Sequence, residues 1–111
     1  MICAEFEVHE KSIILSIRGH AGHAEKGRDL ICASASMLAY TLAQMAIFMH
    51  KEGKLQKKPK IRLDSGDGCV VVKPNEEAFA EALHCFLVVQ VGFGLLAKNY
   101  PDFVQVRCME V

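Results

Sequence analysis

Residues 2–9 constrain the fold most strongly, because apolar side chains recur there at every second position. Ile2, Ala4, Phe6 and Val8 are separated by residues that are mostly polar. A period of two places one face of an extended chain on a core and the other face in water. The pattern therefore predicts a strand at the start of the chain. Residues 12–18 return after a short polar corner, which favours an antiparallel second strand.

The next ordered element is predicted to be a helix. Asp29 is a suitable N-cap, and apolar residues then recur at steps of four, three and four along one face. We expect this helix to run from Leu30 to about Lys51 and to end at Gly53. Further strands are expected around residues 61–63, 69–73 and 103–110.

A second helix is predicted to begin at the acidic segment 74–77 and to run towards Lys98. Within it, residues 89–93 would also suit a strand, although the length of the apolar segment favours a buried helix. The expected order is strand, strand, helix, strand, strand, helix, strand. The predicted fold class is α+β, a single-domain sandwich with two helices packed on a mixed or antiparallel sheet.

Composition limits the functional classes. The chain has 111 residues, enough for one hydrophobic core, so we expect a single domain over residues 1–111. Thirteen basic and thirteen acidic residues leave no net positive field, which argues against direct DNA binding. The five cysteines show no paired spacing, and the start of the chain shows no export signal. We therefore expect a cytoplasmic protein without a membrane segment, since the most apolar run, residues 85–96, is short.

Candidate chemistry concentrates in residues 19–36, where a glycine-rich loop meets the start of the first helix. Cys32 falls at the third helical position after Asp29, where unpaired backbone amides and the helix dipole favour a thiolate and could also hold an oxyanion. His20 lies twelve residues earlier, at the end of the second strand, and is a natural proton acceptor for such a thiol.

The same segment resembles the bacterial ribosomal-processing cysteine proteases of the Prp family. The resemblance rests on a Gly-His pair, a glycine-containing loop, a Gly-x-Asp-Leu-Ile-Cys-Ala run and a serine four residues after the cysteine. These are Gly19, His20, the run from Gly27 to Ala33, and Ser36.

What the resemblance implies is an endopeptidase that removes the N-terminal extension of large-subunit ribosomal protein L-twenty-seven during ribosome assembly. Cys32 would be the nucleophile and His20 the general base and acid. Asp29 would cap the helix and organise the site, and Ser36 would brace it one turn beyond Cys32. The resemblance also implies a homodimer and a substrate loop. The residues expected in that loop are Gly22, His23 and Gly27.

Three other interpretations remain open. A noncatalytic ribosome-associated binding domain would keep the fold and use the loop only for recognition. A metal site at His20, His23 and Cys32 lacks the fourth ligand typical of structural zinc, so no metal or other cofactor is expected. A redox-sensing thiol would need a resolving cysteine, and the motif contains none. We interpret three of the other cysteines, Cys69, Cys85 and Cys108, as small core residues.

Overall fold

A computed structural model describes residues 1–20 and 29–110 of the chain. The order of elements along it is the predicted one. The strands are β1 (Ile2–Val8), β2 (Ile13–Arg18), β3 (Lys60–Asp64), β4 (Asp67–Val72) and β5 (Val104–Glu110). The helices are α1 (Leu30–Lys51), the short 3₁₀ turn η1 (Glu76–Ala78) and α2 (Phe79–Asn99).

The five strands form one mixed sheet in the order β3-β4-β2-β1-β5. Neighbouring strands pair antiparallel except for β1 and β5, which are parallel. Two parallel strands must be joined by a long crossover connection. Here the connection from β1 to β5 contains all the other strands and helices. The predicted α+β fold with two helices on a mixed sheet is therefore confirmed.

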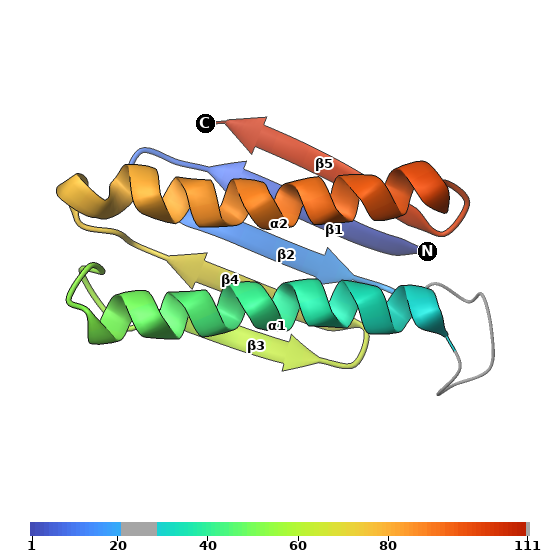
Figure 1. The fold of residues 1–111 in the computed structure, drawn as a ribbon, viewed down its shortest axis with the longest axis horizontal. Helices are drawn as coiled ribbons and strands as arrows, with labels where there is room; N and C mark the ends of the chain where they lie inside the picture. Colours follow the sequence, from blue (N-terminus) through green and yellow to red (C-terminus); the bar gives the residue numbers. More distant parts are fainter. Residues whose placement is uncertain (21–28, 111) are drawn as a thin grey trace.

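Both helices cover the same face of the sheet and lie side by side (Figure 1). The alternating pattern of β1 turns Ile2, Ala4 and Phe6 towards the helices, and all three are buried. Across the layer, Phe93 of α2 meets Phe6 edge to face with ring centroids 6.0 Å apart. One continuous hydrophobic core therefore lies between the sheet and the helix layer.

Residues 89–93, for which a strand was the alternative, belong to α2. A reason is visible at Gly92, where an added Cβ would lie 2.6 Å from a methyl carbon of Leu38 on α1. The glycine lets the two helices approach closely, so it serves helix packing and does not break the helix. The helix begins later than predicted because η1 occupies its expected first turn.

The outer face of the helix layer carries almost no charge. Residues 30–49 of α1 and 82–97 of α2 contain no Asp, Glu, Lys or Arg, and large apolar side chains are exposed on both helices. The most exposed of these include Leu30, Met37, Phe48, Val88, Val91 and Leu95. A helix that packs on one side only normally carries charge on the other.

The expectation that no segment is long and apolar enough to cross a membrane is wrong. By length and composition alone, both α1 and the segment Glu76–Asn99 meet that criterion. Core helices of water-soluble proteins pass it too, and here each helix buries one side against the sheet. The absence of a membrane partner therefore stays a prediction.

The cysteines expected in the core are less buried than predicted. Cys108 is exposed, while Cys69 and Cys85 are half-buried. Only Cys85 of these three packs against the core cluster. Burial raises the pKa of its thiol, and Glu81 adds to that effect.

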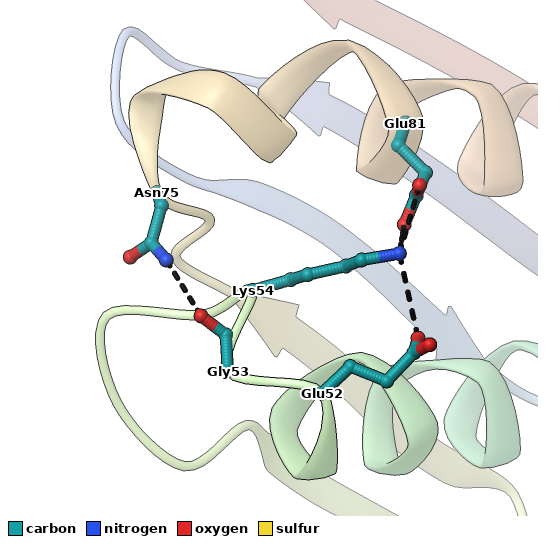
Figure 2. A network of polar contacts seen from close by, with 5 residues as sticks. All are labelled: Glu52, Gly53, Lys54, Asn75 and Glu81. Atoms are coloured by element: carbon teal, nitrogen blue, oxygen red, sulfur yellow. Dashed lines mark hydrogen bonds and ion pairs between the residues drawn. The ribbon is translucent and has the colours of Figure 1, made fainter.

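Polar contacts join the end of α1 to the start of α2, at the end of the helix layer far from the N-terminus of α1 (Figure 2). The Lys54 ammonium donates to both carboxylate oxygens of Glu81, at 2.8 and 3.0 Å, and lies 3.5 Å from Glu52. The side chain of Asn75 donates to the carbonyl of Gly53 at 2.8 Å. These contacts fix the connection that leads from α1 into β3.

Candidate active site

Cys32 lies in the first turn of α1, and the helix begins where Asp29 caps it. The carboxylate oxygen Oδ1 of Asp29 accepts hydrogen bonds from the backbone N–H groups of Ile31 at 3.0 Å and Cys32 at 3.1 Å. Asp29 itself has an extended backbone, as an N-cap residue should. The predicted cap and the predicted first residue of the helix are both confirmed.

The second oxygen of Asp29 contacts the cysteine directly. The Cys32 thiol donates to Asp29 Oδ2 at 3.3 Å. A carboxylate at this distance favours the protonated thiol, whereas the helix N-terminus favours the thiolate. Asp29 therefore acts on Cys32 through both its oxygens, one on the backbone and one on the sulfur.

The expected backbone oxyanion hole is largely occupied in this arrangement. The N–H groups of Ile31 and Cys32 are taken by the Asp29 side chain, and the N–H of Ala33 donates to the Asp29 carbonyl at 3.1 Å. The cap that starts the helix thus uses the same amides that an oxyanion would need.

His20 follows the end of β2, and Gly19 sets its position. Gly19 has φ +92°, and an added Cβ there would lie 2.1 Å from the carbonyl oxygen of Met1. Its N–H donates to the carbonyl of Gly66 at 2.9 Å. Only glycine satisfies both the backbone angle and the lack of space, which explains physically why a glycine precedes the histidine.

His20, Cys32 and Ser36 line one pocket of about 360 Å³. The pocket lies between the start of α1, the end of β2 and the turn that joins β3 to β4. Ser36 is exposed one turn after Cys32. Three residues that the sequence singled out therefore lie at a single cavity.

Other residues that were not predicted from the sequence also line this pocket. Tyr40 is two turns beyond Cys32 on α1 and is half exposed, so helical spacing was a usable signal. Residues 64–68 of the β3–β4 turn had no such signal, because only strand pairing brings them to the pocket.

Gly22, His23 and Gly27 lie outside the described residues, so the expected substrate loop has no structural account here. Within residues 1–20 and 29–110, no group of three or more metal-ligating side chains is close enough to hold an ion.

Comparison with solved structures finds the same fold in bacterial proteins. The Staphylococcus aureus ribosomal processing protease Prp with a covalently linked product peptide has a TM-score of 0.71 and 22% identity, covering 97% of this chain and 99% of that one. The same protease with a substrate peptide has a TM-score of 0.66 and 20% identity, with the same coverage. A Streptococcus mutans protein has a TM-score of 0.70 and 24% identity, covering 100% of this chain and 96% of that one.

A comparison with curated proteins found no match. A protein-family model, described as cysteine protease Prp, matches residues 1–105. That span contains the pocket with its cysteine, its histidine and both elements that carry them. The chain belongs to the cysteine protease Prp family.

Proposed function

We propose that this cysteine protease cleaves its substrate with a dyad of Cys32 and His20. The observation that carries the proposal is that both side chains line the same pocket at the start of α1. A thiol at a helix N-terminus together with an imidazole is the arrangement that activates cysteine nucleophiles. Asp29 and Ser36 are supporting residues, the first through the cap and the thiol contact, the second through its place on the same helix face.

In the proposed reaction, His20 takes the proton of the Cys32 thiol, and the sulfur attacks the carbonyl carbon of the scissile peptide bond. The C–N bond breaks, the imidazolium gives its proton to the leaving amine, and a thioester remains on Cys32. Water, deprotonated by His20, then hydrolyses the thioester and releases the new carboxyl terminus. Before the first step the thiol has to leave the Asp29 oxygen that it contacts.

We propose the N-terminal extension of ribosomal protein L-twenty-seven as the substrate, cut in the cytoplasm during ribosome assembly. The motif from Gly19 to Ser36 supports this through the family resemblance. The similar Staphylococcus aureus structures are described as a ribosomal processing protease bound to a substrate or product peptide. We propose that Gly22, His23 and Gly27, which lie in sequence between the pocket residues His20 and Cys32, contact the peptide.

We also propose that the protein acts as a homodimer joined through the outer face of α1 and α2. A second copy is the occupant that this face fits, because two uncharged surfaces meet without opposing like charges. Val91 is exposed near the middle of α2. Sedimentation should show a dimer that Val91→Glu converts to a monomer, whereas Met109→Glu on β5 should leave it intact. A native monomer would contradict this interface.

The experiment that tests the activity is mass spectrometry of a peptide covering the N-terminus of the host's own L-twenty-seven protein. It is incubated with the native protein, Cys32→Ala or His20→Ala. Matched controls are Cys108→Ala, which removes an exposed cysteine, and His50→Ala, which removes an exposed histidine at the other end of α1. We expect one cut in the native protein and both controls, and none in the two dyad variants.

Each other outcome has a definite meaning. Cleavage that survives either dyad substitution contradicts the mechanism. Binding of the peptide without any cleavage by the native protein favours the noncatalytic binding domain. Neither binding nor cleavage contradicts the proposed substrate.

A further inference from the structure

We propose that Gly66, in the β3–β4 turn, is a positioning residue for His20. The absence of a side chain at this position leaves the space that the imidazole occupies. The inference rests on the proposed function, since it matters for catalysis only if His20 transfers the proton.

The contact is with the nitrogen-bearing end of the ring. An added Cβ at Gly66 would lie 2.5 Å from His20 Nε2, and 3.1 and 3.2 Å from the two ring carbons bonded to that nitrogen. Ordinary contact distances between such atoms are 3.4 Å or more. Any other residue at this position would therefore force the ring or the turn to move.

Strand pairing brings the two residues together across 46 positions of sequence. β2 and β4 are antiparallel, and Arg18 faces Asp67 in the last pair of their register. The chain beyond Arg18 therefore meets the turn that precedes Asp67. The Gly19 N–H donates a hydrogen bond to the Gly66 carbonyl at 2.9 Å. This bond joins the backbone just before His20 to the backbone of the β3–β4 turn.

At this contact the backbone cannot give way easily, whereas the exposed imidazole can rotate. The backbone that leads into His20 is fixed at Gly19, whose own space is limited by the Met1 carbonyl. The turn is held by the β3–β4 pairing and by the ion pair of Arg62 with Asp67. We therefore expect a substitution at Gly66 to rotate the imidazole away from its place in the pocket.

A simpler interpretation is that Gly66 serves only the turn, because its φ of +76° disfavours other residues. The chain contains a matched control for this interpretation. Gly53, after the end of α1, has φ +74°, and an added Cβ there meets nothing within 4 Å. Gly53→Ala introduces the same backbone strain as Gly66→Ala but leaves His20 untouched.

The experiment compares native protein, Gly66→Ala, Gly53→Ala and His20→Ala. Thermal unfolding gives the folded fraction of each. Peptide cleavage gives kcat and KM, and peptide mapping after iodoacetamide treatment gives the pH profile of alkylation at Cys32 alone. We expect both glycine variants to unfold at similarly lowered temperatures. Only Gly66→Ala should lower kcat, by about ten- to a hundredfold with KM little changed, since small misplacements of a reacting group have effects of this size.

Gly66→Ala should also move the Cys32 alkylation profile towards that of His20→Ala, whereas Gly53→Ala should keep the native profile. An unchanged kcat and profile in folded Gly66→Ala would overturn the inference, and so would an equal loss of kcat in Gly53→Ala. If His20→Ala cleaves normally, the proposed dyad fails whatever Gly66→Ala does.

The native protein provides a second test that does not depend on a variant folding. Nuclear Overhauser spectra should show a cross-peak between the ring protons of His20 and the α-protons of Gly66. Its absence from spectra in which both residues are assigned would refute the contact itself.

Discussion

Asp29 offers the sharpest test of the site, because its two carboxylate oxygens have separate tasks. Oδ1 accepts two backbone N–H groups at the start of α1, and Oδ2 accepts the Cys32 thiol. Asp29→Ala removes both interactions. Asp29→Asn keeps an oxygen that can cap the helix but removes the negative charge beside the sulfur.

The stability effect can be worked out from the cap. Replacing an N-cap aspartate by alanine costs about 0.5–2 kcal/mol. With an unfolding entropy of about 2.1 cal/mol/K per residue, this corresponds to a drop in Tm of roughly 2–9 °C for a chain of this length. Asparagine caps as well as aspartate and loses only the interaction with the helix dipole, about 0.3–1 kcal/mol. Its Tm should therefore lie between those of the native protein and Asp29→Ala.

The substitutions lower the stability, but Asp29→Asn should raise the reactivity of the Cys32 thiol. Without a carboxylate at 3.3 Å from the sulfur, the thiolate form of Cys32 becomes easier to populate. Iodoacetamide at pH 7 should alkylate Cys32 faster in Asp29→Asn than in the native protein, because the negative charge that disfavours the thiolate is gone. The assay is mass spectrometry of the peptide that contains Cys32, over a time course, with Cys108 as the internal reference.

The control is Asp102→Ala, which removes an exposed aspartate from a turn. The capping argument is refuted if Asp29→Ala lowers Tm no more than Asp102→Ala does. The electrostatic argument is refuted if Cys32 in Asp29→Asn is alkylated no faster than in the native protein.

Two predictions concern the fold. Phe93→Ala removes a fully buried ring that packs on Phe6 and should destabilise the protein by about 3–5 kcal/mol in urea unfolding. Met109→Ala on β5 truncates an exposed side chain away from the helices and should be nearly neutral, so equal losses would contradict the assigned core. The hydrogen bond with Glu81 raises the pKa of Lys54 above its usual 10.5, so its contribution to stability is present at neutral pH and is lost as the pH rises through the higher value. The fall in Tm between pH 9 and pH 12 should therefore be smaller in Lys54→Met; an identical fall would contradict the assignment.

Local sequence signals were sufficient for most of the secondary structure. The limits of α1 were predicted correctly because they depend on neighbouring residues, with Asp29 at its start and Gly53 just after its end. At residues 89–93 the length of the apolar segment favoured a helix over a strand, and the structure confirms the helix. The contact of Gly92 with Leu38 had no local sign, because Leu38 belongs to another helix.

The sequence also showed only part of the functional site. Cys32, Asp29 and Ser36 lie within two turns of one helix, so spacing alone related them to each other. Their relation to His20 was a hypothesis from the motif, and the common pocket now supports it. Cys108 was predicted to be a core residue, but it is exposed. The apolar character of a cysteine does not show which side of an edge strand such as β5 faces the helices.

By itself, the sequence determined the elements, their order and the cap beside Cys32, since these depend on side chains within a few residues of one another. Only the tertiary structure decided that the β3–β4 turn adjoins the end of β2 and that Gly66 leaves space for His20. Such contacts depend on which strands pair and in which register. His20 and Gly66 are 46 positions apart, so the sequence around either residue does not indicate that they meet. Pairing is selected by burying one face of the whole sheet at once, so it is a property of the complete core.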